Sequence, residues 1–312
     1  MRSIILRPVP PFDFSRTAAI FSRGDPGIRV YRDGIFRQAL DIDGIPFLVE
    51  VRSEGTTELP ELSIAIKGDH TVTARIKEKA VEVISRIFST GDDLSPFYRA
   101  MDTDPVMAGL VRELHGLRAP STPSVFEALV DSVIEQQISL HVAQGIEHRL
   151  IRALGNTIST DSTTFYCYPA APALAKTTDA MFRACGLTLR KGEYIRGISQ
   201  QILAGDIDPE VFRDEPDTEA VIHELMKIRG IGRWTAELSI LRGLHRPDAF
   251  PADDVGVRRF ISQYYYGGKK ITAAEARDFA ERWGAWKGFA AYYLEVADLL
   301  ATGQEGTVLT RP

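Results

Sequence analysis

Hydrophobic and polar residues alternate along residues 28–73, the pattern of a half-buried strand. Asp-Gly pairs at 33–34 and 43–44 interrupt the alternation, and such pairs are typical of tight β-hairpin turns. The segments between the turns, such as 47–52, are short and rich in β-branched side chains. The pattern predicts a small antiparallel sheet, followed by a helix over residues 75–88.

Beyond residue 91 the hydrophobic period becomes helical, with Gly and Pro interrupting it every ten to twenty residues. Ser124 and Glu127 precede a long apolar helix in the order of a capping box, in which Ser124 accepts a backbone N–H and Glu127 reaches back. Further helices are predicted over 178–184, 190–204, 218–228, 233–243, 255–265, 273–283 and 286–302. We expect a sheet domain over 1–91, a helical domain over 92–303 and a flexible tail over 304–312.

Composition narrows the class of protein. A chain of 312 residues that is 44% hydrophobic has room for two domains with their own cores, which excludes disorder and a coiled coil. Its 37 basic and 42 acidic residues give a net charge of −5, which argues against polybasic nucleic-acid binding but not against a local DNA-binding patch.

Two cysteines are too few for a disulfide framework, a four-cysteine zinc site or a four-cysteine iron–sulfur cluster. No stretch approaches the roughly 20 apolar residues of a membrane span. We therefore expect a cytoplasmic protein without membrane contact, at the nucleoid if its source is prokaryotic.

A tight turn at Gly230 and Gly232 separates two helical patterns and leaves backbone N–H groups without a Cβ in the way. Lys227, Arg229 and Arg233 add positive charge nearby. Exposed amides at the start of a helix suit a phosphate backbone that is read without sequence preference. Plain helical hairpins use the same glycine spacing, so a purely structural turn is the alternative.

Paired carboxylates, Asp253 and Asp254, follow Trp234 by about twenty residues and come just before the helix predicted at 255–265. Either residue is suited to accept the first amides of that helix. We expect one of the pair to do so, which leaves the other free for chemistry.

The segments Gly-Ile-Gly-Arg-Trp-Thr-Ala at 230–236 and Phe-Pro-Ala-Asp-Asp at 250–254 resemble those of the helix-hairpin-helix DNA glycosylases, and within them the AlkA-like 3-methyladenine glycosylases. Further fragments that resemble this family, in the same order along the chain, lie at 10–15, 126–139, 183–187 and 281–286. The resemblance spans about residues 8–295.

The resemblance implies an α+β, predominantly helical fold, in which an antiparallel sheet domain like that of the TATA-binding protein precedes a two-lobed, all-α helix-hairpin-helix body. It implies binding of double-stranded DNA with a damaged base, and because a search for damage along DNA does not require more than one copy, we expect a monomer. That base is flipped into a cleft between the lobes, because chemistry on a glycosidic bond needs access that the base stack denies.

Site residues follow from the same resemblance. Asp254 is the implied catalytic carboxylate, so that Asp253 is the helix cap, and Trp234 is the implied aromatic wall of the base pocket. The other implied pocket residues are Leu238, Val255 and Glu295, three positions at which the best-known bacterial member carries aromatics. Tyr292, Tyr293 and Phe21 are aromatic residues that can compensate, whereas Trp283 and Trp286 have the spacing of a helix-junction core.

The resemblance also implies contacts with DNA. Gln137 occupies the position of the wedge that fills the gap left by the flipped base, with Gln136 as the alternative. The implied phosphate-binding residues are Gly230, Gly232, Arg233 and Thr235. No cofactor is required, although the backbone carbonyls of Met226, Ile228 and Ile231 match positions that hold a monovalent cation, Na⁺ or K⁺, when DNA is bound.

Relatives with lyase activity carry a lysine at the position of Trp234, and this chain has none between Lys227 and Lys269. The resemblance therefore predicts a monofunctional N-glycosylase, a hydrolase of base excision repair for alkylated purines: 3-methyladenine and 7-methylguanine, then hypoxanthine and ethenoadenine. The alternatives are a non-catalytic helix-hairpin-helix DNA-binding protein and a glycosylase for oxidised purines. The missing lysine disfavours the usual enzyme for 8-oxoguanine, and the cysteine count disfavours the iron–sulfur branch.

Overall fold

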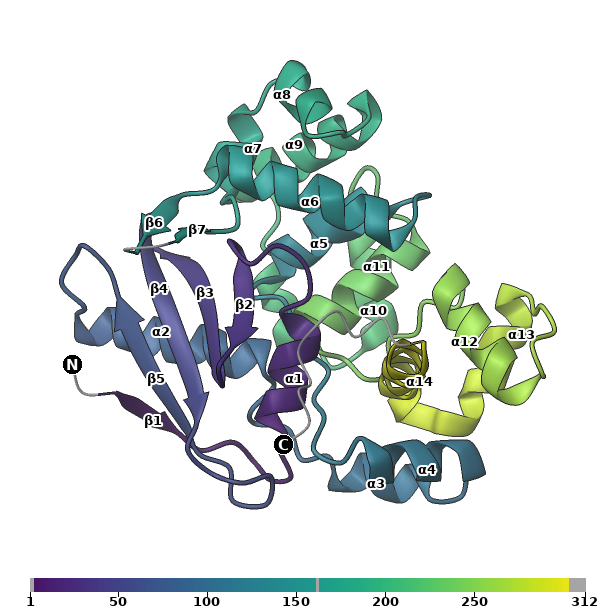
Figure 1. Ribbon diagram of the computed structural model, residues 1–312. Helices are drawn as coiled ribbons and strands as arrows, with labels where there is room; N and C mark the ends of the chain where they lie inside the picture. The colour runs from purple at the N-terminus through teal and green to yellow at the C-terminus, as the bar shows by residue number, and fades with distance from the viewer. Residues whose placement is uncertain (1–2, 161–162, 303–312) are drawn as a thin grey trace.

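A computed structural model describes residues 3–160 and 163–302 of the chain. Its first part is a five-stranded antiparallel sheet with the strand order β1-β5-β4-β3-β2 (Figure 1). Asp33 and Asp43 have positive φ angles of 55° and 57°, as the predicted hairpin turns require. The strands are β1 (Ile4–Leu6), β2 (Arg29–Arg32), β3 (Ile35–Ile42), β4 (Ile45–Ser53) and β5 (Leu62–Lys67). The predicted sheet is confirmed, while β1 and the helix α1 (Phe14–Phe21) had no clear sequence signal.

The two faces of the sheet pack against different partners. Alternate residues of β4, Phe47 and Val49, share a core with the helix α2 (Ala74–Ile87), which corresponds to the helix predicted at 75–88. Leu48 points to the opposite face and packs with Ile158 and Phe165. These two residues belong to a short antiparallel ribbon, β6 (Thr157–Ser159) and β7 (Thr164–Tyr166).

The ribbon is a departure from the all-α body expected from the sequence. Each of its strands has three residues, too few for the alternation of polar and apolar residues to be recognised. It is stabilised because its apolar side chains cover the second face of the sheet.

The rest of the body has two helical lobes with separate hydrophobic cores, which confirms the two-lobed expectation. The first lobe contains α5 (Val125–Glu135), α6 (Leu140–Leu154), α7 (Ala171–Lys176), α8 (Asp179–Ala184), α9 (Leu189–Ala204), the 3-10 turn η1 (Pro209–Arg213), α10 (Thr218–Leu225), α11 (Arg233–Ser239) and the π-helical turn η2 (Ile240–Leu244). The second contains α3 (Ser95–Met101), α4 (Pro105–Glu113), α12 (Val255–Tyr265), α13 (Ala273–Ala280), the 3-10 turn η3 (Glu281–Trp286) and α14 (Lys287–Ala301). Leu241 of η2 packs against both cores, so the lobes meet there.

Helix ends show where local signals decide the structure. The helix predicted at 218–228 ends at Leu225, because residues 226–232 form the turn of the hairpin. The predicted capping box is half-formed, with the Ser124 Oγ accepting the amide of Glu127 at 3.1 Å. A complete box lies at Thr272 and Glu275 of α13.

Trp283 is 2% exposed and its Nε1 donates to Asp104 Oδ2 at 3.3 Å, which confirms its expected place in the core. Trp286 packs half-buried on the same core. In the part of the chain that is described, no helix is both long and apolar enough to cross a bilayer. The predicted tail at 304–312 lies outside the described residues.

Candidate active site

The hairpin between α10 and α11 contains two glycines with opposite surroundings. Gly230 has a φ of +97°, and a Cβ there would lie 2.3 Å from Cγ of Tyr194. The fold therefore requires glycine at this position. A Cβ on Gly232, in contrast, would meet no atom of the described residues within 4 Å. The backbone at Gly232 is open to an approaching partner although the fold itself does not require glycine there.

Each of the three basic residues expected to add positive charge at the hairpin is paired with a carboxylate. The N···O distances are 2.6 Å for Lys227 to Glu224, 3.5 Å for Arg229 to Glu193, 2.5 Å for Arg233 to Glu219 and 2.9 Å for Arg233 to Glu237. The positive field at the hairpin is therefore weaker than the sequence suggested. Its backbone amides become the main candidates for phosphate contact.

Asp254 is the N-cap of α12, so the assignment of that role to Asp253 was wrong. Asp254 Oδ1 accepts the amides of Gly256 at 2.7 Å and Val257 at 3.1 Å. Its Oδ2 accepts Nε1 of Trp234 at 3.1 Å. The same carboxylate therefore caps α12 through Oδ1 and accepts the indole N–H of Trp234 through Oδ2. The neighbouring Asp253 is exposed.

The bond between Trp234 and Asp254 joins the two lobes, since α11 belongs to the first core and α12 to the second. A second polar link runs nearby from Arg277 of α13 to Glu237 of α11, at 2.9 Å. Glu237 is 1% exposed, and burial raises its pKa although Arg277 and Arg233 oppose the shift. The candidate catalytic carboxylate therefore lies where the lobes meet.

A bidentate ion pair fixes α12 to α14. The Arg259 guanidinium donates to the two oxygens of Asp298 at 3.1 and 2.9 Å. Glu295 lies one turn before Asp298 and is exposed, yet protein atoms crowd its carboxyl group. This desolvation raises the pKa of Glu295, against the effect of Arg242, and the negative charge of Asp254 raises it further. Glu295 is thus within electrostatic reach of Asp254.

The remaining pocket candidates differ in exposure. Leu238 is 6% exposed and belongs largely to the protein interior, whereas Val255, next to Asp254, is 72% exposed. Tyr293 is buried with its hydroxyl donating to the carbonyl of Leu117 at 2.8 Å, so it is a core residue. Tyr292 has a buried hydroxyl with no hydrogen-bond partner in the described structure, one turn before Glu295 on α14.

The connection between α5 and α6 separates the two wedge candidates. Gln136 Nε2 donates to the carbonyl of Gly230 at 2.9 Å and to the Thr235 hydroxyl at 3.0 Å. Gln137 is exposed and has a left-handed φ of 58°. Only Gln137 of this pair has a side chain free to enter DNA. Because Thr235 is buried and bonded to Gln136, a DNA contact at Thr235 would use its backbone.

Comparison with known proteins identifies the family. A family model described as "HhH-GPD superfamily base excision DNA repair protein" matches residues 130–285. The chain belongs to this superfamily. It is 33% identical over 218 residues to a DNA-3-methyladenine glycosylase of Bacillus subtilis, which covers 70% of this chain and 72% of that protein.

Solved structures of DNA glycosylases have a similar fold. A 3-methyladenine DNA glycosylase from Archaeoglobus fulgidus superposes with a TM-score of 0.80 at 27% identity, covering 95% of this chain and 98% of that one. An 8-oxoguanine glycosylase/lyase of Clostridium acetobutylicum, solved with double-stranded DNA, has a TM-score of 0.74 at 20% identity, covering 96% of each chain. The second likeness shows the fold alone.

The superfamily match includes Gln137, the hairpin and Asp254, and it ends before Glu295. The implied cation ligands, the carbonyls of Met226, Ile228 and Ile231, lie within the same match. Main-chain carbonyl oxygens are ligands of alkali cations in proteins. The Ile228 carbonyl accepts the amide of Ile231 at 3.0 Å and keeps a second lone pair. These carbonyl oxygens are therefore chemically suitable ligands for a monovalent cation.

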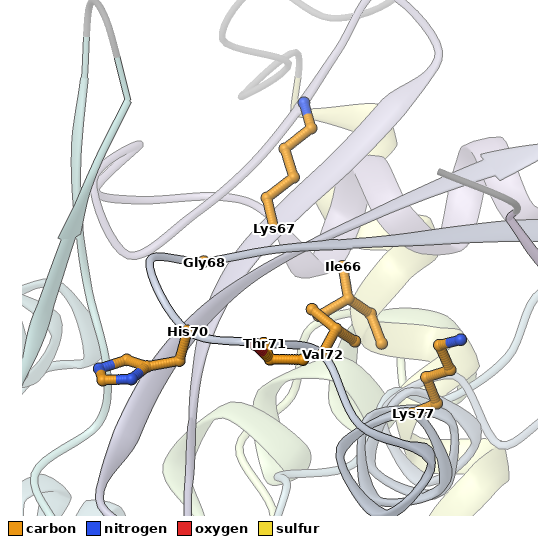
Figure 2. Close-up of a pocket in the computed structure, with 7 residues that line it drawn as sticks. All are labelled: Ile66, Lys67, Gly68, His70, Thr71, Val72 and Lys77. Atoms are coloured by element: carbon orange, nitrogen blue, oxygen red, sulfur yellow. The ribbon is translucent and has the colours of Figure 1, made fainter.

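A surface pocket lies elsewhere, where β5 runs toward α2 (Figure 2). The imidazole of His70 and the ammonium group of Lys77 point away from each other there (Figure 2). The sheet and the helices α11 and α12 lie on opposite sides of the view in Figure 1. None of the superfamily's implied site residues lines this pocket, which contains Ile66, Lys67, Gly68, His70, Thr71, Val72 and Lys77.

Two residues of the site lacked a usable sequence signal. The role of Gln136 as a tie to the hairpin depends on Gly230, 94 residues away in sequence. Glu237 has the spacing of an ordinary salt bridge to Arg233, but its burial between α11 and α13 is a tertiary property. Neither position is recognisable without the packing of the lobes.

Proposed function

We propose that the protein is a monofunctional DNA glycosylase of base excision repair that hydrolyses the N-glycosidic bond of alkylated purines, 3-methyladenine first among them. The observation that carries the proposal is the carboxylate of Asp254, held by three N–H donors beside the indole of Trp234 where the lobes meet. The names of the relatives in Bacillus subtilis and Archaeoglobus fulgidus support this choice of substrate.

The proposed substrate complex begins with double-stranded DNA on the hairpin, bound by one copy of the protein. The amides around Gly232 contact a phosphate, and the damaged base leaves the stack to reach Trp234. An alkylated purine is positively charged, and an aromatic face attracts such a base with about 0.5–2 kcal/mol. Because the Trp234 Nε1 is bonded to Asp254, the ring is fixed before the base arrives.

The chemical step uses Asp254 Oδ2, which accepts one N–H and keeps a further lone pair. The bond between the base nitrogen and the sugar breaks, and its electron pair neutralises the cationic base. The carboxylate stabilises the positive charge that develops on the sugar. It also accepts a proton from the water molecule whose oxygen forms the new bond to the sugar carbon that carried the base. Little acid catalysis is needed because the leaving base is neutral once released.

Glu295 gives the pocket a polar side. A carboxyl group has an oxygen that accepts hydrogen bonds from amino groups such as those of methylated adenine and guanine. We therefore rank 3-methyladenine and 7-methylguanine ahead of hypoxanthine and ethenoadenine as substrates.

The absence of strand cleavage is part of the proposal. Residue 234 is tryptophan, which has no amine to form a Schiff base with the sugar. Incubation with abasic DNA and borohydride is expected to trap no covalent complex. A trapped complex, with nicked DNA in parallel reactions, would show a bifunctional enzyme instead.

The decisive experiment measures free base release before any alkaline step. Methylated DNA supplies 3-methyladenine and 7-methylguanine, and duplexes with single lesions supply hypoxanthine, ethenoadenine and 8-oxoguanine. The wild-type protein is expected to release the methylated purines, and Asp254→Asn is expected to release them at least about 100-fold more slowly while still binding DNA. Equal rates for both proteins would remove the catalytic role of Asp254. Binding without release of any base would indicate a non-catalytic DNA-binding protein.

A further inference from the structure

Lys191 of α9 caps the end of α5 with its side chain. Its Nζ donates to the carbonyl of Ile134 at 2.8 Å and to that of Gln136 at 2.7 Å. Carbonyls at a helix C-terminus lack partners within the helix, and a cation there is favourable. Lys191 is half-buried, and across residues 3–160 and 163–302 no carboxylate pairs with it. Its ammonium group thus serves the end of α5 rather than an ion pair.

Gln136 connects this capped helix end to the hairpin. Its carbonyl accepts from Lys191, while its side-chain amide donates to the Gly230 carbonyl and the Thr235 hydroxyl. The next residue, Gln137, has a left-handed backbone, which residues other than glycine adopt only at an energetic cost. A strained residue of this kind persists only where its neighbours are fixed.

The same face of α9 also supports the hairpin. Tyr194 lies one turn after Lys191, and its ring packs where a side chain on Gly230 would be. One helix face therefore holds the end of α5 through Lys191 and the hairpin through Tyr194. The phosphate-binding turn and the exposed Gln137 are therefore held in place by the same helix.

We infer that Lys191 is a positioning residue for base extrusion, because it fixes Gln137 relative to the hairpin that binds the DNA. This inference rests on the proposed function, since a wedge has a role only if a base is flipped. Without the cap, the strained backbone at Gln137 relaxes and its side chain no longer fills the gap in the stack. The extruded base then returns to the duplex more often.

The test compares Lys191→Met with Lys191→Arg and with Lys176→Met, an exposed lysine of α7 in the same lobe. Extrusion is followed by the fluorescence of 2-aminopurine placed beside the lesion. Base release is measured in single turnover for a fully paired lesion and for a lesion opposite an abasic site, where less stacking and pairing must be broken.

Lys191→Met is expected to lower extrusion by about ten-fold or more, and to lower base release from the paired lesion by the same factor. Base release from the lesion opposite the abasic site is expected to stay within about three-fold of wild type. Lys191→Arg keeps a donor for the carbonyls and is expected to restore most of the loss, and Lys176→Met is expected to match wild type. Gln137→Ala is expected to reproduce the Lys191→Met loss, and the double variant to lose no more than Gln137→Ala alone.

Several results would overturn the inference. Lys191 would have a role unrelated to the wedge if Lys191→Met extruded the base like wild type. The same would follow if base release fell equally on both duplexes, or if the losses in the double variant were additive. If Lys191→Met fails to fold, Gln136→Leu decides, because it cuts the bonds to the hairpin and leaves the lysine cap. A wild-type protein that releases no base from either duplex would instead refute the proposed function.

Discussion

The indole Nε1 of Trp234 donates to Asp254 Oδ2 at 3.1 Å, so the candidate pocket wall and the candidate catalytic carboxylate orient each other. Neither side chain can change conformation without breaking a bond that also joins the two helical lobes. The properties of the two residues are therefore coupled, and substitutions at either one test both.

Replacing Trp234 separates the ring from its N–H group. Trp234→Phe keeps an aromatic face and leaves Asp254 Oδ2 without its donor, so we expect base release to fall by about three- to ten-fold. Trp234→Ala also removes the ring and is expected to cause a loss of about 30-fold or more. Single-turnover release measures both effects. Equal losses in the two variants would assign the role to the N–H group rather than to the ring face.

Asp254 has a structural and a chemical role that different substitutions separate. Asp254→Ala removes the cap of α12 and is expected to lower the free energy of unfolding by about 1 kcal/mol. Asp254→Asn keeps an oxygen for the cap and is expected to be more stable than the alanine variant, with both nearly inactive. Urea denaturation and base release provide the measurements.

The neighbouring Asp253 is the matched control for Asp254. It is exposed and is not the cap, so Asp253→Ala is expected to resemble wild type in stability and in activity. An Asp253→Ala protein as inactive as Asp254→Ala would transfer the catalytic assignment to the first aspartate.

The two hairpin glycines give opposite expectations. Gly230→Ala forces a Cβ into the ring of Tyr194 at a positive φ, and we expect a loss of about 1–3 kcal/mol in the free energy of unfolding. Gly232→Ala places a methyl group in open space and is expected to change stability by less than about 0.5 kcal/mol. Its DNA affinity, measured by fluorescence anisotropy, is expected to fall because the methyl group obstructs a phosphate. Unchanged affinity would argue against phosphate binding at Gly232.

Acidic side chains gather where the sheet domain meets α5 and α6. Arg29 of β2 lies 3.7 Å from Glu147, and the Tyr168 hydroxyl donates to Asp131 at 2.6 Å. Burial raises the pKa of Glu127 to about 8, against the effect of Arg29 and with a contribution from Glu147. Burial also raises the pKa of Asp131 well above its usual value.

These shifts predict that stability decreases as the pH rises. Between its usual pKa of 4.5 and about 8, Glu127 binds a proton in the folded protein but not in the unfolded chain. Its contribution is therefore complete below the lower value and is lost as the pH approaches the higher one. We expect the free energy of unfolding to fall by a few kcal/mol over this range, as measured by urea denaturation at several pH values.

Glu127→Gln is expected to flatten this pH dependence, since the amide does not titrate. Glu78→Gln, at an exposed position of α2, is the control and is expected to keep the wild-type slope. A Glu127→Gln protein with the full wild-type slope would mean that other groups cause the effect.

The sequence was most informative where local chemistry decides the structure. The helix predicted at 255–265 has the observed bounds, and the turns at Asp33 and Asp43 have the expected backbone. The resemblance to the glycosylases rested on short fragments whose order along the chain is itself specific, and the family match confirms it.

The predictions from sequence were wrong where two neighbouring residues are equally suited to one role, or where interacting residues are distant in sequence. Adjacent aspartates are equally suited to cap a helix, so only the geometry of α12 distinguishes Asp254 from Asp253. The charges at Arg229 and Arg233 are offset by Glu193 and Glu219, which approach only after folding. The β6–β7 ribbon forms because the sheet offers an apolar face, a condition that its own residues do not encode.

That ribbon has a mechanical consequence. Ile158 and Phe165 are shared between the sheet and a strand pair that follows α6, so the sheet domain and the first lobe resist separation. Residues of β4 are packed on both faces of the sheet, whereas Val255 at the start of α12 is 72% exposed, so hydrogen exchange is expected to be faster in α12 than in β4.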